Sequence, residues 1–282
     1  MLLAVSLRSS STLLLSVLVL AACIGQGLDD RRARAATLAA ARNWQLLRLD
    51  VSPLPLIAYV PTSITAAETL TVYMEGDGLA WLTRSHPSDD PTPRRPLALE
   101  LALQHAPGVA AYLGRPCQYL DADETEDCAP AYWTSHRFSP EVVEASNRAI
   151  SALKEGFGAT QLVLVGYSGG GAIAALVAAR RQDVVQLVTV AGNLDHHLWT
   201  RHHGVLRLDG SLNPALEWER LRNVPQLHFV GADDANIPAW IATHYASAFP
   251  ASERPEIRIV PGFNHVCCWA ERWPELYEGA TR

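Results

Sequence analysis

The chain has 282 residues, of which 49% are hydrophobic and 18% are charged, and its formal net charge at pH 7 is −6. This length and composition fit one globular domain with a substantial core, and they exclude a chain that is disordered throughout. The acidic balance, together with the lack of a basic run interleaved with aromatic residues, argues against a nucleic-acid partner.

The first residues predict a signal for export. Arg8 precedes an apolar stretch at residues 12–20, which is about half as long as the roughly 20 residues that a membrane-spanning helix needs. The run Leu20-Ala21-Ala22-Cys23 resembles the bacterial lipobox, in which cleavage leaves a cysteine as the new N-terminus for lipid attachment. Because Ile24 follows the cysteine, this resemblance implies the outer membrane, with the domain facing the periplasm. A plain secretory signal with an incidental cysteine is the alternative.

We therefore expect a signal peptide at residues 1–22, a linker at 23–40 and a single domain at 41–282. In the domain, apolar strands alternate with helices, which is typical of a mostly parallel sheet covered on both faces. The predicted strands are Gln45–Val51, Leu54–Val60, Leu70–Glu75, Val109–Leu113, Gln161–Val165, Val184–Val190, Leu227–Val230 and Ile257–Val260. The predicted helices are Leu97–His105, Pro140–Gly156, Gly169–Arg181, Pro238–Phe249 and a Trp-rich C-terminal segment. The pattern predicts an α/β fold with about eight strands.

Four cysteines remain once Cys23 is assigned to the lipid. In an exported protein they are expected to form disulfides, and four cysteines allow three pairings. The short spacing favours Cys117 with Cys128, which closes one acidic loop. The neighbours Cys267 and Cys268 are left without an assigned pairing. Adjacent cysteines do not suit a tetrahedral zinc site, so no metal is predicted there.

Ser168 has the sequence context of a catalytic nucleophile. The predicted strand at 161–165 runs into Gly166-Tyr167-Ser168-Gly169-Gly170, and a helical pattern follows at once. In this strand–turn–helix context, G-x-S-x-G places the serine on a sharp turn where small neighbours let the strand and the helix approach. The alternative is a glycine-rich helix start that only packs closely or holds a phosphate.

A serine hydroxyl needs a base to take its proton, and the base needs an acid to orient it. His265 follows the last predicted strand, which is the position that the chain order Ser, acid, His requires. Asp234 and its neighbour Asp233 follow the penultimate strand and compete for the acid position, and Asp195 is a third candidate after an earlier strand.

Two backbone N–H groups would bind the oxyanion that forms when the serine attacks. The residue after the nucleophile, Gly169, supplies one of them. The other is expected from the loop after the strand at 70–75, where Asp77 is the candidate in Glu75-Gly76-Asp77-Gly78. The Asp77 carboxylate is unusual at this position, and it argues against a preference for anionic substrates.

Residues 70–269 resemble the α/β-hydrolase superfamily, and Asp234 is the preferred acid because Gly231, Asp234 and Pro238 match a spacing frequent in that superfamily. More narrowly, the chain resembles lipoprotein serine hydrolases of Gram-negative bacteria. The runs that carry the narrower resemblance are Glu75-Gly76-Asp77-Gly78 with Trp81, Gly114-Arg115-Pro116-Cys117-Gln118-Tyr119, Ser211-Leu212-Asn213-Pro214, and His265 with Cys267-Cys268-Trp269. The resemblance implies an α/β-hydrolase fold without a large cap domain.

The resemblance also implies hydrolysis of an ester, or of a related thioester or amide, without an organic cofactor. The expected partners are a small or lipid-like acyl substrate and, through the N-terminal lipid, a membrane. A lipoprotein that uses this fold as a binding or scaffold module is the alternative.

Four histidines between His196 and His203 present a second pattern. Together with Asp195 they would suit a metal cluster, but they fall where α/β-hydrolases carry pocket loops. We therefore favour substrate contact or plain surface for these side chains, and we predict no metal site.

Overall fold

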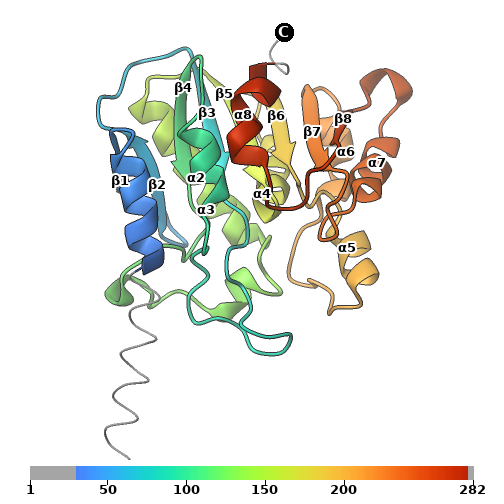
Figure 1. The fold of residues 1–282 in the computed structure, drawn as a ribbon, viewed down its shortest axis with the longest axis horizontal. Helices are drawn as coiled ribbons and strands as arrows, with labels where there is room; N and C mark the ends of the chain where they lie inside the picture. Colours follow the sequence, from blue (N-terminus) through green and yellow to red (C-terminus); the bar gives the residue numbers. More distant parts are fainter. Residues whose placement is uncertain (1–29, 279–282) are drawn as a thin grey trace, which may run out of the picture.

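The computed structural model describes residues 30–278 (Figure 1). The predicted signal peptide and the lipidation site at Cys23 lie outside these residues. Within the part described, no helix is both long enough and apolar enough to cross a bilayer.

One sheet of eight strands runs through the molecule, in the order β1-β2-β4-β3-β5-β6-β7-β8. β1 pairs with β2 and β2 with β4 in antiparallel fashion, while every other pair is parallel. The mostly parallel sheet predicted from the sequence is therefore confirmed. The strands are β1 Trp44–Leu49, β2 Leu56–Pro61, β3 Thr69–Met74, β4 Val109–Leu113, β5 Gln161–Tyr167, β6 Val184–Val190, β7 Gln226–Gly231 and β8 Glu256–Val260.

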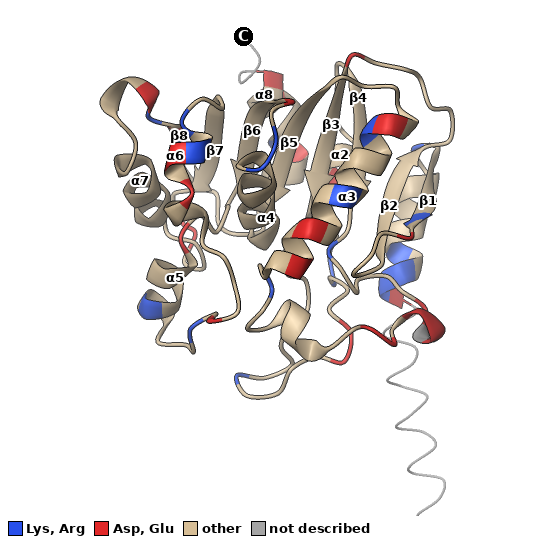
Figure 2. Ribbon diagram, turned by 180° about the vertical axis from the view of Figure 1, so that it is seen from behind, with Lys and Arg blue, Asp and Glu red and all other residues tan. Residues whose placement is uncertain are grey.

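Helices cover both faces of the sheet. The helix at residues 30–40, α2 and α8 lie on the face toward the viewer in Figure 1, and α3, α4 and α7 lie on the face seen in Figure 2. The helices are α2 Leu97–Ala102, α3 Pro140–Gly156, α4 Gly169–Ala178, α5 His196–His203, α6 Trp218–Leu221, α7 Ala239–Ser247 and α8 Trp269–Glu278. Short 3₁₀ turns occur at Ala122–Glu124, Pro130–Trp133, Pro214–Leu216 and Ala251–Glu253.

Side-chain alternation along the central strands builds one core on each face. In β5, Leu162 and Leu164 join the cluster under α3 and α4, whereas Val163 and Val165 join the cluster under α2 and α8. Because successive strand residues point to opposite faces, a strand buried on both sides is apolar at every position. This is why these strands read as continuous apolar runs.

Residues 30–40 form a helix, so the linker predicted at 23–40 is wrong for this part of the segment. Ala35 and Ala39 are buried on its inner face, one turn apart, within the core that also contains α2. Alanine favours helix formation but adds little to a hydrophobic pattern, so the buried face is weakly marked in the sequence.

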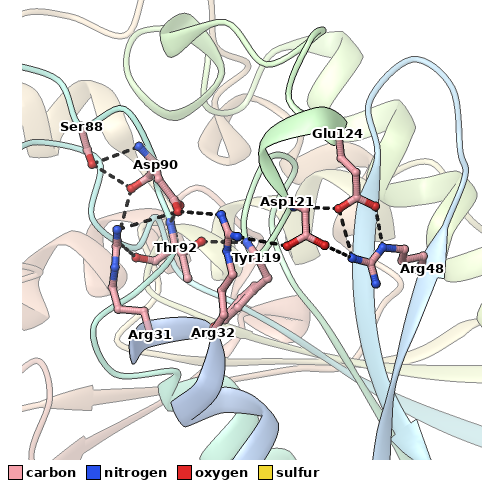
Figure 3. Close-up of polar contacts among 9 residues, drawn as sticks. All are labelled: Arg31, Arg32, Arg48, Ser88, Asp90, Thr92, Tyr119, Asp121 and Glu124. Carbon is pink, nitrogen blue, oxygen red and sulfur yellow. Dashed lines mark hydrogen bonds and ion pairs between the residues drawn. The ribbon is translucent and has the colours of Figure 1, made fainter. Parts of the chain in front are cut away.

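An ion-pair network fixes this helix to two loops (Figure 3). Arg31 donates hydrogen bonds to the main-chain oxygens of Asp90 and Thr92. Arg32 lies 3.5 Å from a carboxylate oxygen of Asp90 and 3.1 Å from one of Asp121. Ion pairs near the surface each add only about 0.2–1 kcal/mol, so the network positions the helix more than it stabilises the fold.

Both pairs of cysteines in the described domain are bonded. Cys117 is joined to Cys128, the pairing expected from the sequence, across a separation of 11 residues. Cys267 is joined to its neighbour Cys268, a pairing that the sequence left open.

Substitution of Trp273 on α8 tests the contribution of the core on its face of the sheet to stability. Its side chain is fully buried, and its indole N–H donates to the Tyr73 hydroxyl over 2.9 Å. We expect Trp273→Ala to lower the free energy of unfolding by about 3–5 kcal/mol, because it leaves a cavity and removes a buried hydrogen bond. Trp240→Ala, at a side chain that is 43% exposed, is the matched control and is expected to cost under about 1 kcal/mol. Urea unfolding measures both; equal losses would contradict this account of the core.

Candidate active site

Ser168 lies in a tight turn between β5 and α4, with a positive φ of 52° and a ψ of −121°. Glycines on either side make the turn possible. A Cβ on Gly166 would lie 2.3 Å from the main-chain oxygen of Gly170, and one on Gly170 would lie 2.3 Å from that of Met74. Any side chain at these two positions would force the backbone apart, so the sequence pattern is needed for this geometry.

A chain of hydrogen bonds connects Ser168, His265 and Asp234. The Ser168 Oγ is 3.0 Å from the His265 Nε2, and the His265 Nδ1 is 2.8 Å from the Asp234 Oδ2. The other oxygen of Asp234, Oδ1, accepts from the backbone N–H groups of Asn236 and Ile237, each over 2.8 Å. Because an ionised carboxylate only accepts, it places the proton of a neutral imidazole on Nδ1 and leaves Nε2 free to accept from the serine hydroxyl.

The two other candidate acids are not part of this arrangement. Asp233 is exposed. Asp195 is buried at the start of α5, where its Oδ1 accepts from the backbone N–H groups of His197 and Leu198 and from the Asn213 amide. This carboxylate caps the helix, which accounts for its burial without a role beside His265.

The histidine run forms α5, and its rings serve different contacts. His196 is buried, with Nε2 3.2 Å from the Leu212 carbonyl oxygen, and burial lowers its pKa to about 4. His203 lines the cavity, with Nε2 2.8 Å from the Asn236 carbonyl oxygen. Among residues 30–278, no group of three potential metal ligands comes together.

The loop at residues 75–78 packs directly on the serine turn. A Cβ on Gly76 would lie 3.3 Å from the Ser168 Cβ, and one on Gly169 would lie 2.1 Å from the Asp77 Oδ1. Neither the Asp77 nor the Gly169 backbone N–H has an acceptor among the residues that the structure describes. Both donors expected from the sequence therefore lie next to the serine and are unused within the fold.

Two buried arginines neutralise the Asp77 carboxylate. Arg115 Nη1 is 2.9 Å from its Oδ1, and Arg137 Nη1 is 2.7 Å from its Oδ2. Burial alone would raise the pKa of Asp77, but the two guanidinium groups outweigh it and hold the pKa below its usual value. Sequence reasoning missed both arginines, although Arg115 lies in one of the runs that carry the family resemblance. The cluster of Asp77, Arg115 and Arg137 carries a net positive charge, so the aspartate does not make the site negative.

The Glu75 side chain holds the same loop through hydrogen bonds. It is fully buried, its Oε1 accepts from the Gly76 N–H over 2.8 Å, and its Oε2 accepts from the Tyr112 hydroxyl over 3.2 Å. Burial raises the pKa of Glu75 to about 7 in spite of these hydrogen bonds. The Glu75 carboxyl group therefore titrates near neutral pH.

Ser168 and His265 open into a cavity of about 1190 Å³. Its walls come from the loops that gather at the carboxyl ends of the parallel strands, at the lower end of Figure 1. Apolar walls include Trp81, Leu82, Trp199, Val205 and Leu206. Arginines on the walls are Arg84, Arg94, Arg95, Arg137 and Arg207. A cavity of this size accommodates a drug-sized or larger ligand.

The sheet order and the helices on both faces are those of the α/β-hydrolase fold, and the comparisons agree. The family model described as the alpha/beta hydrolase fold matches residues 118–254, and the chain has this fold. No curated protein matches the sequence.

Solved structures that resemble the chain include Est1E, naproxen esterase and TT1662. Est1E from Butyrivibrio proteoclasticus is 12% identical, with a TM-score of 0.57, covering 84% of this chain and 97% of Est1E. Naproxen esterase from Bacillus subtilis is 12% identical, with a TM-score of 0.54, covering 89% and 96%. TT1662 from Thermus thermophilus is 18% identical, with a TM-score of 0.53, covering 84% and 97%. At these identities the likeness shows the fold.

The raised pKa of Glu75 predicts a pH-dependent stability. Its proton is bound more tightly in the native state than in the unfolded chain, where the pKa is near 4.5. Its contribution to folding is therefore complete below about pH 4.5 and is lost as the pH rises to about 7, a change of about 3 kcal/mol. Glu75→Gln, which keeps an acceptor for the Gly76 N–H, should lack this loss. Urea unfolding of both proteins between pH 5 and 8 measures the difference, and parallel curves would refute it.

Proposed function

We propose that the protein is a serine hydrolase that cleaves acyl esters through a covalent acyl-enzyme. The observation that carries this proposal is the pair of distances at His265, 3.0 Å to the Ser168 hydroxyl and 2.8 Å to the Asp234 carboxylate. This is the geometry that a nucleophile, its base and an orienting acid require.

In the proposed mechanism, His265 takes the hydroxyl proton as the Ser168 oxygen attacks the ester carbonyl. Asp234 holds the ring and stabilises the imidazolium that forms. The N–H groups of Asp77 and Gly169 bind the oxyanion, and each such donor is worth about 3 kcal/mol in the transition state. The imidazolium then protonates the departing alcohol, and the same histidine activates a water that releases the acid.

Two features support an ester as the bond that is cleaved. The cavity beside Ser168 has apolar walls suited to an acyl chain. In addition, the solved structures that share the fold include naproxen esterase, whose name describes ester hydrolysis. We further propose that Cys23 carries a lipid that holds the domain at the outer membrane, on the periplasmic side.

Labelling with a fluorophosphonate probe tests the nucleophile. The wild-type protein should react covalently, because the probe phosphonylates a serine that a base activates. Ser168→Ala should not label and should lose activity on p-nitrophenyl butyrate, while its unfolding transition stays near that of the wild type. A folded wild-type protein that fails to label would favour the scaffold alternative.

Substitution of the three candidate acids tests which one orients His265. Asp234→Asn should lower kcat by about 10⁴-fold, because the amide no longer fixes the tautomer in which Nε2 accepts. Asp233→Asn is the neighbouring control and should stay within about twofold of wild type. Asp195→Asn keeps a capping side chain on α5 and should also stay close to wild type. A larger loss at 233 or 195 than at 234 would reassign the acid.

A further inference from the structure

We propose that the cavity binds an anionic amphiphile: an apolar chain that carries a phosphate or carboxylate group, held by Arg84 and Arg94 at the mouth. The inference rests on the proposed function in one respect, namely that the ester of such an amphiphile is the substrate. The binding itself follows from the distribution of charge and apolar surface over the cavity.

The cavity has a charge opposite to that of the whole chain. The chain has 29 acidic and 23 basic residues, yet five arginines and only two acidic residues, Glu75 and Asp77, line the cavity. Asp77 is already paired with Arg137 and with Arg115 behind the wall. A cavity of one sign within low-dielectric walls concentrates ligands of the opposite sign.

Arg84 and Arg94 carry the positive charge of the cavity wall that no carboxylate of the described residues balances. Both are exposed, and neither has a carboxylate within 4.0 Å in the described part of the chain. The other arginines of the wall have partners: Arg95 lies 2.6 Å from Glu100, and Arg207 lies 3.1 Å from Asp209. Figure 2 shows basic positions on the loops that project past the carboxyl ends of the strands. Two unpaired guanidinium groups at one mouth suit a phosphate or a carboxylate.

Exposed apolar side chains surround the same mouth. Trp81 is 38% exposed, Leu82 51%, Val205 48% and Leu206 89%, and all four line the cavity. Apolar surface of this kind, gathered at the entrance of a pocket, is typical of a binding site. Arginine beside apolar surface selects a ligand that has both characters, which excludes a purely hydrophobic ester and a small polar anion as the preferred ligand.

Binding of three ligands that share an eight-carbon chain tests the proposal on the unmodified protein. The ligands are octyl phosphate, octanoate and the uncharged octyl glucoside, each titrated calorimetrically below its micelle concentration in 50 mM salt. At least one of the anions should bind tenfold or more tightly than octyl glucoside. The preference should shrink in 500 mM salt, because screening weakens contacts between exposed charges. The tighter anion assigns the group: octyl phosphate indicates a lipid headgroup, and octanoate indicates a free acid.

A double variant, Arg84→Gln with Arg94→Gln, should reduce the anion preference to threefold or less. Arg42→Gln is the matched control, since Arg42 is also exposed and is not part of the cavity wall; it should keep the preference. Equal binding of all three ligands, or a preference that survives the double variant, would overturn the proposal. These ligands contain no cleavable ester, so a failure of the fluorophosphonate experiment leaves the binding result unaffected and the two proposals can fail separately.

Discussion

The close approach of backbone segments at Ser168 is the constraint on which the rest of the site depends. The serine turn has room only because Gly166 and Gly170 lack side chains, and the second of these lies against the end of β3. A third contact of the same kind joins the other half of the site: a Cβ on Gly231 would lie 2.3 Å from the Phe263 carbonyl oxygen. The turn with the acid therefore lies against the loop with the histidine, and sheet order alone does not produce this closeness.

How much could be predicted from the sequence depends on whether the information is local. Ser168 lies in a motif that specifies its own turn, and His265 follows from chain order, so these assignments need no tertiary knowledge. Arg115 and Arg137 bind Asp77 although they are 38 and 60 residues away from it in the sequence. No local sequence pattern predicts ion pairs over such separations. The helix at 30–40 was missed for another reason, since its buried face consists of alanines whose burial is decided by the neighbouring core.

The contacts of Arg115 and Arg137 with Asp77 change the interpretation of an acidic residue beside the proposed oxyanion site. Read from the sequence, the carboxylate argues against anionic ligands. In the fold, Arg115 and Arg137 both contact it, and each guanidinium is itself almost fully buried. A buried carboxylate held on both oxygens cannot rotate freely, so the same contacts that cancel its charge also fix the loop that packs on the serine turn. Positioning and charge balance therefore come from one group of side chains.

The helix at 30–40 has a consequence for the proposed lipid anchor at Cys23. Arg31 near its start bonds to the main chain at Asp90 and Thr92, in the loop that continues into Arg94 at the cavity mouth. A lipid on Cys23 would be separated from the helix by seven peptide units, which reach at most about 25 Å. A connection of this length would keep the entrance of the cavity close to the bilayer surface. Encounters with amphiphiles would then occur along that surface, in two dimensions instead of three.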